Sequence, residues 1–180
     1  NGGLYVAATP DILRFEDRDG DGRAEVRNQV FTGFGTGLKV LNVQAMLNSM
    51  QWGMDNRVHL LGGSGNRGEI RSVEHPEIAA EEIGARDFWF DPITHSFGFE
   101  TGGAQYGMSY DAYGRKFGCS NSDHLQHWVY SPATQRSGFF PMPAARRSIA
   151  VDGGAAEVFR ISPDEPWRII RTRWRVAGTV

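Results

Sequence analysis

MQWGMDNRVHLL, residues 50–61, predicts one strand, a polar turn and a returning strand. Asp55 and Asn56 supply the turn, because short polar side chains stabilise turns by bonding their own backbone. The segment MSYDAYGRKFGCS, residues 108–120, follows the same plan. Four positions match at a spacing of 58 residues: Met50, Trp52, Asn56 and Arg57 correspond to Met108, Tyr110, Gly114 and Arg115. Repeats of roughly 40–60 residues built from short strands are typical of β-propeller blades.

The rest of the sequence favours the same all-β architecture. It holds 23 glycines and 12% aromatic residues, and amphipathic helical patterns are scarce beyond a short helical turn expected at 43–50. At this period the chain divides into about three blades of four-stranded antiparallel sheet, with approximate limits 1–48, 49–105 and 106–180. A closed propeller needs at least ~4 blades. We therefore expect residues 1–180 to form a single partial propeller, covered by the remaining propeller segments or by another chain.

Charge and hydropathy argue against two kinds of partner. The formal net charge is −2, and the best candidate for a basic patch is the segment 167–175, which contains Arg168, Arg171, Arg173 and Arg175. Apolar and basic residues mostly alternate there, so we interpret it as a strand with one wet face and expect no nucleic-acid partner. No apolar run approaches the roughly 20 residues of a membrane helix, which predicts no transmembrane segment.

The segment DRDGDGRAE, residues 17–25, connects two predicted strands and carries the most specific chemistry of the chain. Carboxylates this close repel unless a cation lies between them, and Gly22 allows the sharp turn of a calcium-binding loop. The expected oxygen ligands are Asp17, Asp19, Asp21, the carbonyl of Arg23 and Glu25. The position of the final EF-hand glutamate holds Asn28, so the loop is not an EF-hand. We predict a structural calcium ion; a metal-free acidic hairpin is the alternative.

Two polar segments flank the strands of the second repeat. Residues 102–108 precede one strand and residues 120–124 follow its partner, so both segments lie at one end of the same hairpin. We therefore predict that Gln105, Asn121 and Asp123 line a cofactor or substrate pocket. The alternative is ordinary turn chemistry, in which these side chains bond nearby backbone groups.

Three further features carry weaker signals. The glycine-rich loop GGSGNRG, residues 62–68, lacks the ending of a phosphate loop, and its Arg67 either lines the pocket or belongs to a flexible connection. His124 and His127 begin a predicted strand, which argues against a shared metal ion. Cys119 has no base partner in the sequence, so we expect an inert, buried thiol and no nucleophilic catalysis.

Four segments together resemble a known group of proteins. They are GGLYVAATPDILRFEDRDGDGRAEV, NSMQWGMDNRVHLLGGSG, GGAQYGMSYDAYGRKFGCSNSDHLQHWVY and AEVFRISPDEPWRIIRTRWRVAG. In content and order they look like the bacterial membrane-bound dehydrogenase propeller family, within the soluble quinoprotein glucose and sorbosone dehydrogenase-like β-propellers. Family members continue beyond this C-terminus, and many carry a haem-binding Cys-x-x-Cys-His domain further on.

The resemblance implies oxidation of a sugar or alcohol with pyrroloquinoline quinone and calcium, in the periplasm or outside the cell, with electrons passed to a c-type cytochrome. The residue match is incomplete. The Arg-Asn-x-Gln-Gly motif that holds the quinone corresponds to residues 102–107, where Gln105 is retained and the Arg and Asn are not. The position of the general-base histidine holds Asn48, which cannot usefully accept a proton at neutral pH.

Two classes of function follow from these observations. The first is a calcium-stabilised quinoprotein dehydrogenase-like propeller in which Gln105, Asn121, Asp123 and Arg67 line the cofactor pocket. The second is a non-catalytic propeller that binds a glycan or a protein partner through aromatic side chains, or that serves as a structural subunit of an electron-transfer assembly.

Overall fold

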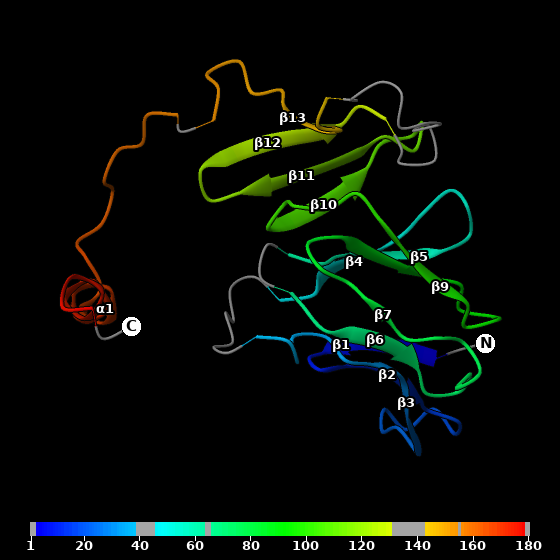
Figure 1. The fold of residues 1–180 in the computed structure, drawn as a ribbon. Coiled ribbons are helices and arrows are strands. Elements are labelled where there is room, and N and C mark those ends of the chain that lie inside the picture. The colour runs from blue at the N-terminus through cyan, green and yellow to red at the C-terminus, as the bar shows by residue number, and fades with distance from the viewer. Residues whose placement is uncertain (1–2, 39–45, 64–65, 131–142, 155, 179–180) are drawn as a thin grey trace.

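The computed structural model describes residues 3–38, 46–63, 66–130, 143–154 and 156–178. These residues form three antiparallel sheets and one helix, which confirms the all-β prediction (Figure 1). Each sheet is open, because its strand order has two edges and does not close on itself.

The strands are distributed over the sheets as follows. The first sheet has the order β1 (Gly3–Ala8), β2 (Asp11–Glu16), β3 (Val26–Thr32), β6 (Glu69–Ser72) and β7 (Glu81–Glu82). The second has the order β4 (Asn48–Trp52), β5 (Val58–Leu61), β8 (Asp87–Phe90) and β9 (Phe97–Glu100). The third has the order β10 (Tyr106–Tyr110), β11 (Lys116–Ser120), β12 (Asp123–Trp128) and β13 (Arg146–Ser148).

Apolar side chains join the second sheet to both of its neighbours. Figure 1 shows the second sheet between the first and the third. Phe31 of β3 packs edge-on against Phe88 of β8 at a centroid distance of 5.3 Å, and Phe90 lies 5.2 Å from the same ring. Leu61 of β5 joins a smaller cluster with Trp128 of β12. Burying each large apolar side chain stabilises the fold by about 1.5–3 kcal/mol.

The 58-residue repeat of the sequence is also a repeat of the structure. In the β4–β5 hairpin the paired residues are Asn48 with Leu61, Gln51 with His59 and Trp52 with Val58. In the β10–β11 hairpin they are Tyr106 with Cys119, Ser109 with Phe117 and Tyr110 with Lys116. Every residue of the second set lies 58 positions after its counterpart, and both hairpins shift register at the same place. The two hairpins therefore share one backbone design.

The strands of the first two sheets alternate along the chain. Strands β6 and β7 lie between β5 and β8 in sequence, yet β6 pairs with β3, placing Ser72 opposite Phe31. Gly33 makes this approach possible: its φ is +113°, and a Cβ there would lie 2.0 Å from the carbonyl oxygen of Glu69. Only glycine fits that position.

This alternation changes how the expected blade limits relate to the sheets. The first sheet draws its strands from residues 3–82 and the second from residues 48–100, so the two interleave. The third sheet draws its strands from residues 106–148 and forms a simple meander. The approximate limits 1–48 and 49–105 thus do not each enclose one sheet.

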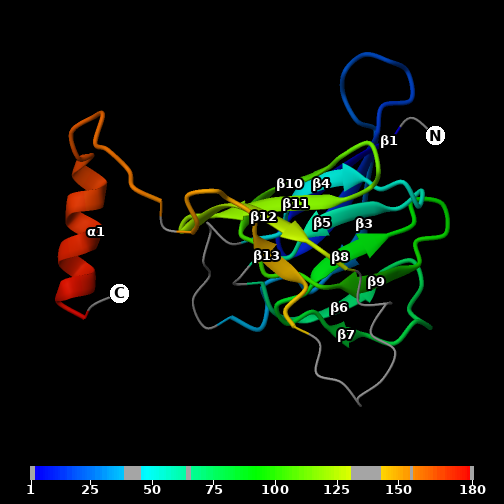
Figure 2. The ribbon, with the colours of Figure 1, turned by 90° about the horizontal axis from the view of Figure 1, so that it is seen from above.

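The C-terminal segment is a helix, so the strand expected from its alternating residues is wrong. Helix α1 (Pro166–Val176) begins with a proline, whose fixed φ suits the first helical turn. Trp167, Ile170 and Trp174 recur at helical spacing and form one apolar stripe. The alternation was interrupted by two consecutive isoleucines, which a helix accommodates and a one-sided strand does not. Both views show α1 standing apart from the sheets (Figures 1 and 2).

Two other expectations concern helices. The helical turn expected at 43–50 lies partly outside the described residues, and its last residues belong to β4, which begins at Asn48. Among the described residues, no helix has the length and apolar character that crossing a bilayer requires.

Candidate functional site

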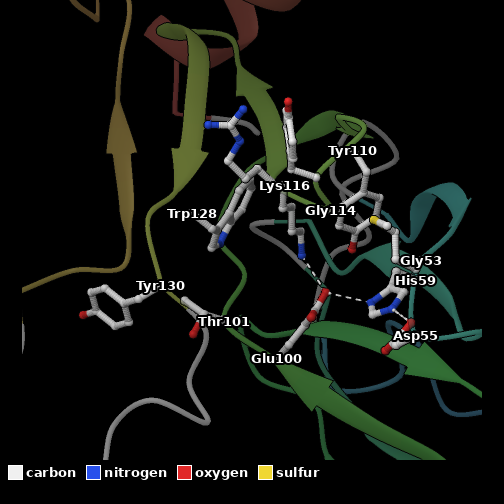
Figure 3. Close-up of a pocket in the computed structure, with 13 residues that line it drawn as sticks. Gly53, Asp55, His59, Glu100, Thr101, Tyr110, Gly114, Lys116, Trp128 and Tyr130 are labelled. Carbon is white, nitrogen blue, oxygen red and sulfur yellow. Dashed lines mark hydrogen bonds and ion pairs between the residues drawn. The ribbon is translucent and has the colours of Figure 1, made fainter.

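A cavity of about 580 Å³ between the second and third sheets brings ionisable and aromatic side chains together (Figure 3). The second sheet contributes His59 of β5 and Glu100 at the end of β9. The third sheet contributes Tyr110, Lys116 and Trp128 from β10, β11 and β12. The Lys116 ammonium lies 4.7 Å from the centre of the Trp128 ring, a cation–π contact that joins charge to aromatic surface.

Five charged side chains form a continuous network along this cavity, which we call the charge chain: Asp55, His59, Glu100, Lys116 and Asp87. His59 Nε2 lies 3.0 Å from Asp55 Oδ1, and its Nδ1 lies 3.2 Å from Glu100 Oε1. Lys116 Nζ lies 2.7 Å from the same Glu100 oxygen and 2.6 Å from Asp87 Oδ2. Acids and bases alternate from the half-exposed Asp55 to the fully buried Asp87.

Glycines lie against both ends of the charge chain, where a larger residue would not fit. A Cβ on Gly53 would lie 2.6 Å from His59 Nε2, so glycine there leaves room for the ring. At the other end, Asp87 Oδ1 accepts a hydrogen bond from the backbone N–H of Gly62 at 2.9 Å. A Cβ on Gly102 would lie 2.6 Å from that same Asp87 oxygen. The backbone therefore closes tightly round the buried carboxylate.

The carboxylates beside His59 favour its charged form. Burial by itself lowers the pKa of His59, but Glu100 and Asp55 outweigh burial and raise the pKa above its usual value. For Glu100, burial raises the pKa, while His59 and Lys116 outweigh it and bring the pKa down to about 2. The protonated His59 ring and the Glu100 carboxylate therefore stabilise one another.

Asp87 shares Lys116 with Glu100, but its pKa moves in the opposite direction. Burial raises the pKa of Asp87 to about 6, the Glu100 carboxylate adds to the rise, and Lys116 offsets only part of it. Burial and the carboxylates of Glu100, Asp55 and Asp87 also raise the pKa of Tyr110 well above its usual value. Tyr110 therefore remains a neutral phenol.

Sequence reasoning missed the charge chain, although the repeat contained a signal for it. Lys116 stands 58 positions after Val58, which is 4% exposed in the apolar core. A lysine at the buried position of a repeat needs buried acids nearby, because an unpaired buried charge is strongly unfavourable. That exception to the apolar pattern could have located the site.

The predicted pocket residues occupy the other end of the β10–β11 hairpin, and the structure brings two of them together. Gln105 Oε1 accepts the backbone N–H of Asn121 at 3.2 Å, and the backbone oxygen of Gln105 accepts Asn48 Nδ2 at 3.0 Å. Asn121 Oδ1 accepts the hydroxyl of Tyr106. Asp123 lies on β12, where its carboxylate accepts the hydroxyl of Ser148 at 2.9 Å. These contacts join segments that are separate in sequence, and the role of the three residues in lining a pocket stays a prediction.

The other candidate residues are placed as follows. The backbone oxygen of Arg67 accepts the N–H of Gly37 at 3.4 Å, in the loops beside the first sheet. His124 and His127 both lie on β12, as the strand prediction required, and His127 stacks on the Phe117 ring. Cys119 is half-buried, and burial raises the pKa of its thiol, which therefore remains protonated at neutral pH.

The acidic loop lies between β2 and β3. Asp17, Asp19, Asp21 and Glu25 each offer an oxygen within 4.8 Å of the others, and all four are exposed. Asp17 also accepts backbone N–H groups of Gly20 and Gly22 at 2.7 and 2.9 Å. Arg23 donates its backbone N–H to Asp21 at 2.8 Å. A set of carboxylate oxygens at this spacing fits a hard divalent cation such as calcium.

A second cavity, of about 600 Å³, lies between the first and second sheets. Leu4, Trp52 and Ile93 line it, and all three side chains are exposed. Its described lining carries a charge at Arg14. Acids and bases meet in the cavity of the charge chain instead, so that cavity is the better candidate for a functional site.

Comparisons with known proteins identify a family but no activity. A family model described as a domain of unknown function (DUF7133) matches residues 1–179. No curated protein matches the chain, and no solved structure matches it.

Proposed function

Because the chain belongs to the DUF7133 family, whose function is unknown, we propose a function from the geometry of its site. The chain binds a neutral, polyhydroxylated ligand such as a glycan in the cavity between the second and third sheets. The observation that carries this proposal is that every member of the charge chain is already bonded to a group of opposite charge.

This pairing favours binding over catalysis. A general base needs a free lone pair and a pKa near the working pH. Both nitrogens of His59 face carboxylates, the pKa of Glu100 is about 2, and Tyr110 remains a phenol. Asp87 has a pKa of about 6, but it is fully buried and its oxygens bond Gly62 and Lys116. Paired charges still accept and donate further hydrogen bonds, which suits a ligand that carries many hydroxyl groups.

Aromatic side chains complete the cavity. Tyr110, Tyr113, Trp128 and Tyr130 all line it, and Tyr113 is 81% exposed. Aromatic rings offer a flat apolar face beside a polar edge, so they can cover the C–H faces of a sugar while neighbouring charged groups bind its hydroxyls. The cavity volume falls within the usual range for small-molecule sites, roughly 300–1,000 Å³.

A glycan array followed by calorimetry with the best-bound glycan tests this proposal. Tyr113→Ala removes an exposed ring of the cavity and should weaken binding at least tenfold, whereas Tyr106→Ala, at the other end of the same hairpin, should leave it within about twofold. The recovered glycan should be chemically unchanged. Absence of binding across the array, equal losses in both variants, or conversion of the glycan would each contradict the proposal.

We further infer that the three sheets are consecutive blades of an incomplete β-propeller. The matching registers of the two repeated hairpins, the meander of the third sheet and the position of the second sheet between the other two support this inference (Figure 1). The outer sheets would then be covered by the remaining propeller segments or by another chain. Electron microscopy of the resulting assembly should show a closed ring; a stable monomer with both outer faces in solvent would contradict it.

Calcium in the acidic loop is a separate proposal with its own test. The four carboxylates lie on an exposed hairpin, so the ion would stabilise the loop and take no part in ligand binding. Metal analysis after dialysis should find about one calcium per chain at millimolar supply. Asp19→Ala should lower the melting temperature only when calcium is present, and an equal loss in chelator would indicate a metal-free hairpin.

Oxidation of a sugar or alcohol by bound pyrroloquinoline quinone is the second candidate function. One observation favours it: Asn48 and Gln105, which the resemblance relates to the family's site, lie together with Asn121, which we predicted to line the same pocket. The fit is poor, because the quinone carries three carboxylates and the side-chain amides of Asn48 and Gln105 already bond to backbone groups of Gln105 and Asn121, so no oxidation step is derived. Absorption spectroscopy after addition of quinone and calcium tests this function. A bound-quinone spectrum that sugars bleach would favour it, and a periplasmic cytochrome would then be the electron acceptor.

A further inference from the structure

Glu74, His75 and His95 meet where the first and second sheets face one another. Glu74 and His75 follow β6 of the first sheet, whereas His95 lies in the turn between β8 and β9 of the second. One ligand atom of each residue lies within 4.8 Å of those of the other two. We propose that these three side chains bind a divalent transition-metal ion of the zinc class and thereby tie the first sheet to the second.

The turn between β8 and β9 presents His95 in one orientation. The backbone N–H of His95 donates to the carbonyl oxygen of Asp91 at 2.9 Å, and its φ is +51°. A residue other than glycine in this left-handed region is unfavourable and persists only where its surroundings impose it. The ring is buried and packs edge-on against Tyr5 and Phe31, at 6.4 and 6.2 Å between centroids. The side chain is therefore fixed before any ion arrives.

The hydrogen bonds of His95 define which nitrogen is available. Its Nε2 lies 3.1 Å from the hydroxyl of Tyr5, which lies 3.3 Å from the carbonyl oxygen of Pro92. A carbonyl only accepts, so Tyr5 donates its proton to Pro92 and accepts the N–H of His95 Nε2. In the neutral ring, the lone pair of Nδ1 then faces Glu74 Oε2, another acceptor. Two acceptors in contact require a proton or a cation between them.

His75 supplies the observation that favours a metal ion over a proton. Its Nδ1 lies 3.0 Å from Glu77 Oε1, so donating that N–H leaves Nε2 as the unprotonated nitrogen. Its backbone N–H donates to Ser72 Oγ at 3.1 Å, which fixes the start of this turn. Histidines that ligate metals almost always donate their other N–H to a carboxylate, carbonyl or similar partner. Glu77 and Tyr5 are those partners here.

The donor set determines the class of ion. Two imidazole nitrogens and one carboxylate oxygen suit zinc and its transition-metal neighbours, whereas calcium and magnesium prefer oxygen ligands throughout. Glu77, which contacts His75 Nδ1, adds a further negative charge, and this favours a cation. A tetrahedral ion with bonds of about 2 Å holds its ligand atoms roughly 3.3 Å apart, so closure requires shifts on the order of 1 Å. Water would fill the fourth position.

Titration of the chain with zinc, and with cobalt as a spectroscopic probe, tests the proposal. The Asp19→Ala background keeps ions out of the acidic loop. One equivalent of zinc should bind and raise the melting temperature, because the ion joins two sheets. Cobalt should give the visible absorption of a tetrahedral nitrogen and oxygen site. No rise in melting temperature together with no cobalt spectrum would overturn the proposal.

Two substitutions and a matched control locate the site. His75→Gln changes a partly exposed side chain, so it should leave the metal-free melting temperature unchanged and weaken zinc binding at least tenfold. Tyr5→Phe removes the partner of His95 Nε2 and should weaken binding about tenfold. His124→Gln, at an exposed histidine paired with Asp152, should bind zinc like the parent chain. Undiminished binding in His75→Gln, or an equal loss in His124→Gln, would contradict the assignment.

Discussion

The β4–β5 and β10–β11 hairpins share their pairing register and differ in what they bury. Position 58 of the first holds a valine in the aromatic core, and position 116 of the second holds a lysine between two carboxylates. The backbone design is thus independent of the side chain at this position. The neighbouring sheet decides which chemistry fits, because one facing surface offers phenylalanine rings and the other offers Asp87 and Glu100.

Replacing the buried valine of the first hairpin by the lysine of the second should cause the largest loss of stability. Val58→Lys places an ammonium in the apolar cluster that contains Phe31, Phe88 and Phe90. We expect a loss of more than about 4 kcal/mol in the free energy of unfolding, or failure to fold. Denaturant unfolding measures it, with Val58→Met as the apolar control. A loss below about 1 kcal/mol would show that this position is not as enclosed as described.

Replacing the buried lysine of the second hairpin by an apolar residue should cause the next largest loss of stability. Lys116→Met leaves the buried Asp87 and the partly buried Glu100 without their shared cation, and we expect a loss of about 3–5 kcal/mol. Adding Asp87→Asn should restore part of that loss, because the amide is neutral and its oxygen still accepts the N–H of Gly62. Equilibrium unfolding of the single and double variants measures both effects. If the double variant is no more stable than the single one, the buried charge is not the cause.

The charge chain should also give this half of the molecule its own pH dependence. Asp87, whose folded pKa is about 6 against an ordinary 3.8, is stabilising in its protonated form, so stability falls as pH rises through that window. The raised pKa of His59 adds stability below its unfolded value of about 6.5, and this is lost as pH rises through the folded value. Glu100 contributes above its unfolded value of 4.5 and loses its contribution as pH falls toward 2.

We therefore expect greatest stability in mildly acidic solution and a melting temperature several degrees lower at about pH 9. His59→Gln should flatten the decline above about pH 6.5 and leave the Asp87 window in place. Melting curves across pH measure both, with His124→Gln as the control for an exposed histidine. A decline above neutrality that is equally steep in His59→Gln would remove His59 as its cause.

The smallest expected effect on stability concerns the two arginines at equivalent positions of the repeat. Arg57 lies 3.8 Å above the Trp89 ring and 3.8 Å from Asp55 Oδ2, whereas Arg115 lies 5.1 Å from the exposed ring of Tyr113 and pairs with Asp111 at 2.6 Å. Arg57→Ala should cost about 0.5–1 kcal/mol and Arg115→Ala about 0–0.5 kcal/mol. Chemical denaturation of the two single variants is sufficient. The reverse order would mean that the surface ion pair outweighs the aromatic contact.

Local patterns were enough to predict the hairpins, because strand alternation and turn residues act within about ten residues of one another. The repeat from Met50 to Arg57 was visible for that reason, and the structure reproduces its register. The placement of β6 and β7 in the first sheet was not predictable in this way. It depends on the approach of Gly33 to Glu69, residues far apart in sequence, whose pairing leaves no local signal.

The site residues likewise separate into those with a local sequence signal and those without one. Gln105 and Asn121 were correctly placed side by side because both flank one hairpin. His59, Glu100 and Lys116 come from separate segments and meet only through packing of two sheets, so nothing near any of them in sequence names the others. The segment 167–175 was wrong for a different reason: two-residue alternation and helical periodicity agree over short stretches, and the proline at its start decides between them.

The alternation of strands between the first two sheets also orders the events of synthesis. Strand β3 cannot pair with β6 until residue 72 has left the ribosome, so the open edge of β3 waits roughly 2–8 s at ordinary elongation rates. During that interval β4 and β5 emerge, and they must not pair with β3 in place of β6. The third sheet draws on one later stretch of chain and meets no such competition. A nascent-chain chaperone would therefore have its work at the N-terminal half.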